Sequence, residues 1–147
     1  MVIDKPIDIL LVEDNPADIR LTQEAFKQTA IANHLHVVRD GAEAVVFLEQ
    51  TDRFAHAPRP DMILLDLNLP KKDGREVLAW IKQSSKFKSI PVVILTTSKA
   101  EEDIAHTYQH HANCFITKPV DLDEFLEVVK RIEQFWLTIV QLPPDIR

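Results

Sequence analysis

Five side chains that can take part in acid, metal or phosphoryl chemistry each follow a short apolar run: Glu13, Asp14, Asp66, Thr96 and Lys118. Each has an ordinary explanation by itself. Acid pairs are usually solvated, a threonine after a strand often caps a turn, and a single lysine usually lies on the surface. Asp66 alone would serve equally well as a turn cap. It is their shared position, at the ends of apolar runs, that indicates a common site.

The chemistry of such a site follows from its charges. Three carboxylates within about 4 Å of one another repel by roughly 4 kcal/mol per pair at an effective dielectric near 20, so they need cations. Mg²⁺ suits an all-oxygen site because it keeps several waters, and the Lys118 ammonium adds a further positive charge. Zinc's usual Cys and His ligands are absent from these positions. Cations beside a hydroxyl suit a phosphoryl group, and Asp66 is then the natural nucleophile, because a carboxylate can form an aspartyl-phosphate.

Hydrophobic patterning predicts the elements that position these residues. Apolar runs at 7–12, 34–38, 62–65, 91–95 and 114–117 predict strands, the third of them buried on both faces. Capping patterns predict helices that begin near residues 16, 41, 74, 98 and 121, the first of which extends to about residue 31. Five strand-helix pairs indicate an α/β fold, a doubly wound parallel sheet with helices on both faces. The carboxyl ends of parallel strands share one edge, where ligand sites form.

Composition narrows the class of protein. A chain of 147 residues with 46% apolar and 27% charged residues predicts a single globular domain. We expect a soluble, cytoplasmic protein: no apolar run approaches the roughly 20 residues of a membrane span, no signal peptide is recognisable, and Cys114 is alone. A net charge of −6 without a basic run longer than two residues argues against direct nucleic acid binding. Only two glycines, Gly41 and Gly74, exclude the glycine-rich nucleotide-binding motifs.

As a set, these residues resemble the receiver domains of two-component response regulators, over about residues 7–135. The resemblance implies a flavodoxin-like sheet with strand order 2-1-3-4-5 and phosphorylation of Asp66 by a sensor histidine kinase. It implies that Asp14 and Asp66 bind Mg²⁺ directly, that Glu13 acts through water, and that the backbone carbonyl of Asn68 adds a ligand.

The resemblance also assigns the phosphoryl-binding and switch positions. Thr96 and Lys118 are expected to contact phosphoryl oxygens, and Pro119 to follow a cis peptide bond. The aromatic switch position falls on Phe115, where tyrosine is common in the family. Without a hydroxyl, any change in burial on phosphorylation would rest on ring packing alone.

A finer resemblance is to the small stand-alone regulators that partner cyanobacterial and bacterial phytochromes. It rests on the segments 15–22 and 68–74 and on Phe135-Trp136-Leu137 with Leu142-Pro143. Such regulators tend to dimerise, which would give the apolar end of the last helix a use as an interface formed by Phe135, Trp136, Leu137 and Val140. The alternative is that these side chains fold back on their own domain.

We therefore expect a phosphoacceptor signalling module that catalyses only its own phosphoryl transfer and slow dephosphorylation. About a dozen residues follow the receiver, so output is expected through protein contact or phosphorelay. One alternative is an Asp-nucleophile phosphatase, but its acid/base aspartate would stand where this chain has Asn68. Another is a phosphorylation-independent scaffold, which the complete set of site residues disfavours. His34 and His36 are assigned no role.

Overall fold

The structure is a computed structural model that describes residues 6–67, 69, 74–96, 114–118 and 121–141. At residues 96, 114–115 and 137–141 it describes the backbone alone. Of the predicted elements, the helix expected to begin near residue 98 lies outside these ranges.

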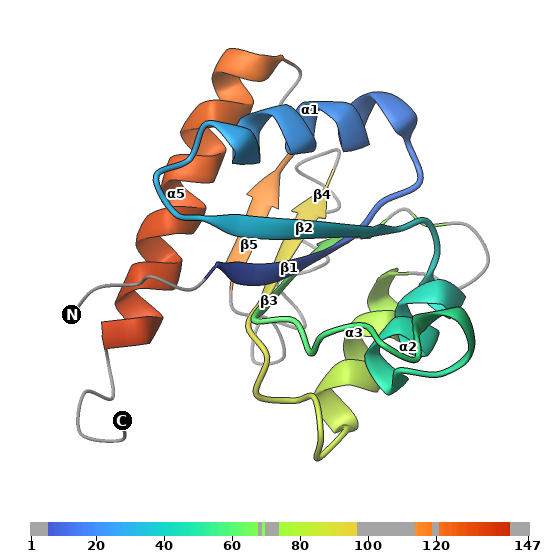
Figure 1. The fold of residues 1–147 in the computed structure, drawn as a ribbon. Coiled ribbons are helices and arrows are strands. Elements are labelled where there is room, and N and C mark those ends of the chain that lie inside the picture. Colours follow the sequence, from blue (N-terminus) through green and yellow to red (C-terminus); the bar gives the residue numbers. More distant parts are fainter. Residues whose placement is uncertain (1–5, 68, 70–73, 97–113, 119–120, 142–147) are drawn as a thin grey trace.

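Five parallel strands form one sheet with the order β2-β1-β3-β4-β5 (Figure 1). They are β1 (Ile7–Val12), β2 (Asn33–Val38), β3 (Met62–Asp66), β4 (Val92–Thr96) and β5 (Cys114–Thr117). The parallel sheet and its strand order are confirmed, with strand ends within a residue or so of the predictions.

Helices cover both faces of this sheet. They are α1 (Pro16–Lys27), α2 (Gly41–Glu49), α3 (Gly74–Gln83) and α5 (Leu122–Gln141), with a short 3₁₀ helix, η1 (Asp52–Phe54), between α2 and β3. Figure 1 shows α1 and α5 packed together on one face and α2 and α3 on the other.

Helix α1 ends four residues earlier than the sequence predicts. The N–H of Gln28 donates to the carbonyl of Ala25, which tightens the last turn. Beyond it, the carboxylate of Glu133 on α5 accepts hydrogen bonds from the Thr29 hydroxyl and from the N–H groups of Ala30 and Ile31. The end of α1 is therefore set by a contact more than a hundred residues away along the chain.

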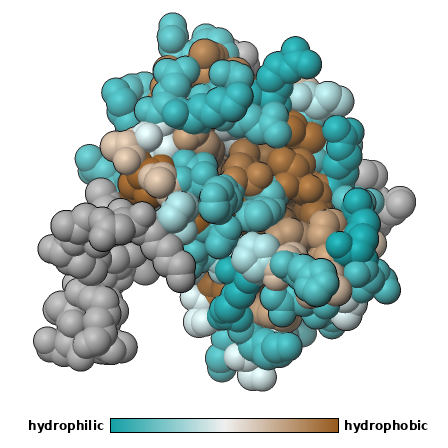
Figure 2. All heavy atoms as spheres, viewed as in Figure 1, coloured by the Kyte–Doolittle hydropathy of each residue, from teal (hydrophilic) through white to brown (hydrophobic). Residues whose placement is uncertain are grey.

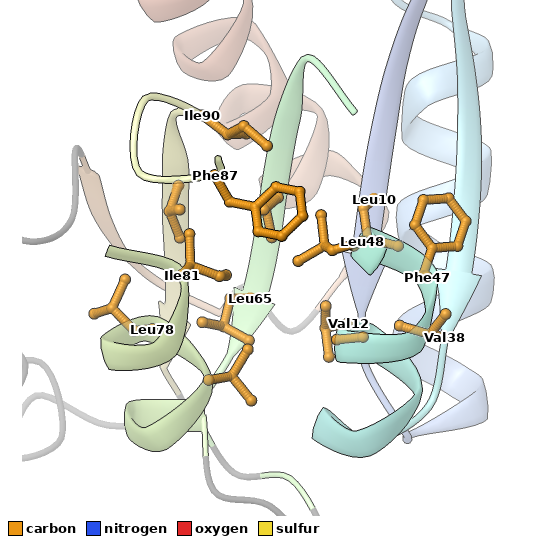
Figure 3. Packing of buried hydrophobic residues seen from close by; sticks show 14 of the residues in the cluster. Leu10, Val12, Val38, Phe47, Leu48, Leu65, Leu78, Ile81, Phe87 and Ile90 are labelled. Atoms are coloured by element: carbon orange, nitrogen blue, oxygen red, sulfur yellow. The ribbon is translucent and has the colours of Figure 1, made fainter. Parts of the chain in front are cut away.

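The central strands are buried on both faces because their side chains alternate between two hydrophobic clusters. Leu10, Val12 and Leu65 pack with α2 and α3, as Figure 3 shows. Their neighbours Ile9, Leu11 and Leu64 belong to the second cluster, which includes α1 and α5. Asp66 is therefore held at the end of a rigid strand.

Side-chain caps fix where the helices begin. Asn15 Oδ1 accepts from the N–H groups of Ala17 and Asp18 at 2.9 and 3.1 Å, and Pro16 is the first helical residue of α1. Asp40 caps α2 through the N–H of Glu43, and Asp121 caps α5 in the same way. These caps confirm the helix starts predicted near residues 16, 41 and 121, and the cap of α1 places its first turn beside the end of β1.

The edge strand β2 is less well covered than the central strands, since its residues are mostly half-buried. Figure 2 shows hydrophobic atoms between α1 and α2 on this face of the molecule. No helix in the described part of the chain is long and apolar enough to cross a membrane.

Candidate functional site

The parallel sheet brings the ends of β1, β3 and β5 together. Glu13 and Asp14 follow β1, Asp66 ends β3, and Lys118 follows β5. In the sheet, Val12 lies beside Leu65, one residue before Asp66. Four of the five predicted site residues therefore meet at this edge. The fifth, Thr96, ends β4, but its side chain lies outside the described residues.

Three carboxylates form a cluster that fits a divalent cation. Glu13, Asp14 and Asp66 each offer an oxygen, and these oxygens lie within 4.8 Å of one another. Glu13 and Asp66 are 1% and 2% exposed, whereas Asp14 is open to solvent. An all-oxygen set with one exposed side suits Mg²⁺ or Mn²⁺, hard ions that retain part of their hydration. These residues fit the implied metal.

The Lys118 ammonium lies among carboxylates. Its Nζ is 2.9 Å from Glu13 Oε1, 2.8 Å from Asp18 Oδ2 and 3.2 Å from Asp66 Oδ2, and its side chain is 9% exposed. An ammonium has three N–H donors, so each carboxylate can take one. Buried and paired in this way, Lys118 partly offsets the charge of its neighbours.

Asp18 is a site residue that the sequence analysis missed. Patterning assigns it only to the first turn of a helix, where acids are common. The structure adds that this turn lies beside the end of β1, so Asp18 reaches the ammonium of a lysine 100 residues away. The available signal was that α1 begins only a few residues after the acid pair, on the ligand-binding edge of the sheet.

Burial and the neighbouring charges both alter the ionisation of Glu13. Burial, and then the nearby charge of Asp66, raise the pKa of Glu13 to about 7, although Lys118 acts in the opposite direction. Burial alone would lower the pKa of Lys118. Its hydrogen bonds to Asp18 and Glu13 and the charges of Asp66 and Glu13 outweigh burial, so that pKa lies above its ordinary value. The site thus favours bound cations and disfavours further negative charge.

A glycine allows α3 to begin close to Asp66. The N–H of Gly74 donates to the carbonyl of Leu67 at 3.2 Å. A Cβ atom at Gly74 would lie only 2.5 Å from the backbone oxygen of Asp66 and 2.6 Å from the Cα of Leu67. Gly74 is therefore required by close packing against the residue that the site is built around.

Comparison with known proteins agrees with this geometry. A model of the response regulator receiver domain family matches residues 9–130. This chain belongs to that family. It is 53% identical to the response regulator Rcp1 of a Synechocystis strain over 138 residues, which is 94% of each chain.

Two crystal structures extend the comparison. The phosphorylated cyanobacterial phytochrome response regulator RcpA is 54% identical, with a TM-score of 0.84 over 95% of this chain and 99% of that one. The Mn²⁺-bound form of Rcp1 is 53% identical, with a TM-score of 0.80 over 90% of this chain and 95% of that one. The predicted resemblance to receiver domains, and to the phytochrome-associated regulators among them, is confirmed.

Some of the receiver positions expected from the sequence lie outside the described residues. These are Asn68, Pro119, and the side chains of Thr96 and Phe115. For Thr96 the backbone is in place, since it ends β4 opposite Thr117 of β5. Their expected roles stay predictions.

The proposed interface on α5 is described only in part. Phe135 and Trp136 are half-buried and pack against the hydrophobic cluster of α1 and α5. The indole N–H of Trp136 is buried and finds no hydrogen-bond acceptor among the described residues. The fold-back alternative thus accounts for part of these two side chains. The side chains of Leu137 and Val140 lie outside the described residues, and dimerisation stays a prediction.

The two histidines of β2 lie away from the receiver site, nearer the start of the strands. His36 Nε2 is 2.9 Å from Asp8 Oδ1, and His34 Nδ1 is 3.5 Å from the same oxygen. Asp8 also donates its N–H to Asp61. The two histidine contacts tie β2 to β1 at the sheet edge, whereas the Asp8–Asp61 hydrogen bond joins β1 to the start of β3. The histidines therefore have a local structural use, although the sequence assigns them no role.

Proposed function

We propose that this receiver accepts a phosphoryl group on Asp66 from a sensor histidine kinase, with Mg²⁺, and signals through protein contact or phosphorelay. The observation that carries the proposal is the placement of Asp66. Its carboxylate is almost fully buried, shares a cluster with two other acids, and lies 3.2 Å from a buried ammonium. A charge buried with an acid pair and a cation suits a reacting group better than a turn cap.

In the transfer step, an Asp66 oxygen attacks phosphorus, and the bond from phosphorus to a kinase histidine nitrogen breaks. The imidazole leaves with that electron pair and takes a proton from solvent, and Asp66 becomes an aspartyl-phosphate. Lys118 stays in place as a fixed positive charge while charge passes from the carboxylate to the phosphoryl oxygens. Mg²⁺, held by Glu13, Asp14 and Asp66, would offset the charge of those oxygens.

The kinase is proposed to be of the phytochrome type. Support comes from the identity of more than half to RcpA, a cyanobacterial phytochrome response regulator. A shallow groove of about 450 Å³ on α1 is a suitable docking place, because it ends beside the site. It is lined by Pro16, Ala17, Arg20, Leu21, Glu24 and Leu122. Leu122 lies four residues after Lys118, and Asp18 projects from the same helix α1.

We propose that the output is a change at a homodimer interface on α5, formed by Phe135, Trp136, Leu137 and Val140. Helix α5 is joined to the site through the short segment that follows Lys118. Sedimentation of the chain at several concentrations, with and without phosphorylation, measures association. A Val140→Glu variant that stays monomeric with an unchanged melting temperature would support the interface. Monomeric wild-type protein in both states would refute it.

The deciding experiment incubates the protein with Mg²⁺ and acetyl phosphate and measures intact mass. One base-labile adduct of phosphoryl mass is expected, absent with EDTA and absent from an Asp66→Ala variant. Asp61→Ala is the matched control, because it removes an aspartate that lies just before the start of the same strand, away from the site. An adduct that persists in Asp66→Ala, or no adduct in the wild type, would refute the proposal.

A further inference from the structure

Asp18 differs from the other two carboxylates that contact Lys118. Glu13 and Asp66 also belong to the three-acid cluster that fits a cation, whereas Asp18 does not. Its carboxylate is 26% exposed and lies 2.8 Å from the ammonium, the shortest of the three ion pairs. Its backbone is held separately, because its N–H donates to Asn15 and its carbonyl accepts from the Thr22 hydroxyl.

The Lys118 ammonium and a bound cation compete for the carboxylates of Glu13 and Asp66. A divalent ion in the cluster would be held by Glu13, Asp14 and Asp66, directly or through water, and Lys118 donates hydrogen bonds to Glu13 and Asp66. Each hydrogen bond from the ammonium occupies a lone pair and places a positive charge near the ion. A third acid that attracts the ammonium from the side of α1 lessens this competition.

We propose that Asp18 is a positioning residue for Lys118: it holds the ammonium against α1 and thereby raises the affinity of the acidic cluster for a divalent metal. The inference rests on the proposed function, since it concerns the same metal. Loss of Asp18 lowers the metal affinity in two ways. Loss of Asp18 removes a negative charge close to the cluster, and it leaves Lys118 with Glu13 and Asp66 as its only contacting acids among the described residues.

If Asp18 only stabilised helix α1, its loss would change the stability of the protein and leave its metal affinity unchanged. Acids in the first turn stabilise a helix through its dipole, and Asp18 stands in the first turn of α1. Loss of that effect would lower the free energy of unfolding without changing metal affinity. Asp123 is a matched control, because it is an exposed acid in the first turn of α5. Its replacement by asparagine removes the same charge and the same dipole interaction.

The experiment titrates Mg²⁺, and separately Mn²⁺, into the metal-free full chain by calorimetry. Asp18→Asn should weaken metal binding about three- to ten-fold, the range expected for the loss of one nearby, partly screened charge. Asp123→Asn should stay within about two-fold of the wild-type affinity. Asp18→Glu, which keeps a carboxylate within reach of the ammonium, should restore at least part of the affinity.

A second measurement tests the route through Lys118. In a Lys118→Met background that keeps its circular dichroism, Asp18→Asn should lose much of its effect, because no ammonium remains to be positioned. Equal affinity of wild type and Asp18→Asn overturns the inference and leaves the proposed metal site standing. An undiminished effect in the Lys118→Met background also overturns it, because Asp18 would then act by charge alone. A wild-type chain that binds neither ion overturns the metal site and this inference together.

Discussion

Replacement of Glu13 by glutamine should stabilise the metal-free protein at alkaline pH and change its stability little at about pH 4, below the unfolded pKa. The pKa of Glu13 is raised from 4.5 to about 7, first by burial and then by the charge of Asp66. Between these values the folded protein holds a proton that the unfolded chain has released. The stabilising contribution of protonated Glu13 is therefore complete below about pH 4.5 and is lost as the pH rises through about 7.

The size of the effect follows from the shift. A change from 4.5 to about 7, at about 1.4 kcal/mol per pKa unit, corresponds to about 3 kcal/mol. Solvent screens this little, since Glu13 is 1% exposed. Glutamine has nearly the shape of a protonated glutamate and cannot ionise. It should therefore match the wild type in acid and exceed it by up to about 3 kcal/mol in base.

Urea unfolding in EDTA at about pH 4 and about pH 9 measures this difference in the free energy of unfolding. Saturating Mg²⁺ should narrow or reverse the gap at about pH 9, because the folded wild type offers the cation three carboxylates and the variant only Asp14 and Asp66, so the wild type gains more stability from binding. Two stability curves that run parallel from acid to base would refute the account of Glu13. So would a wild type that gains stability over Glu13→Gln as the pH rises.

Three further predictions concern the elements around the site. Gly74→Ala places a methyl group 2.5 Å from the backbone oxygen of Asp66 and should cost about 1–3 kcal/mol in urea unfolding and slow phosphorylation by acetyl phosphate. Asp40→Ala removes the cap that accepts from the N–H of Glu43 and should cost about 1 kcal/mol of unfolding free energy, with phosphorylation unchanged. Arg20→Glu, on the exposed groove of α1, should slow radiolabel transfer from a phytochrome-type kinase and leave the acetyl phosphate rate unchanged; equal slowing of both would contradict a docking role.

Much of this fold can be predicted from local residue patterns in the sequence. The run before Asp66 is apolar at every position, which indicates a strand buried on both faces, and β3 is buried throughout. Asn15 and Asp121 are caps recognisable from residue type and spacing alone. The strand order came from the resemblance to receivers, because hydrophobic periodicity does not specify which strands are neighbours.

The parts that could not be predicted depend on contacts distant in the chain. The end of α1 at Lys27 is fixed by Glu133, and no local sequence pattern near residue 27 predicts a contact with the last helix. Asp18 is similar: its spacing predicts a first-turn acid, but its partner depends on the angle at which α1 leaves the sheet. That angle is set by packing against α5, which the sequence does not reveal locally.

The excess of negative charge at this sheet edge connects the fold with the proposed chemistry. Three carboxylates contact one ammonium, and Asp14 adds a fourth acid, so the charges do not balance without a further cation. Repulsion between the buried carboxylates of Glu13 and Asp66 opposes folding. The two hydrophobic clusters that pack on both faces of β1 and β3 offset this unfavourable energy. Such a rigid scaffold keeps the acids close together when no metal is bound, so metal binding requires little rearrangement of the protein. The pKa of Glu13, raised first by burial and then by the charge of Asp66, links proton release to metal binding.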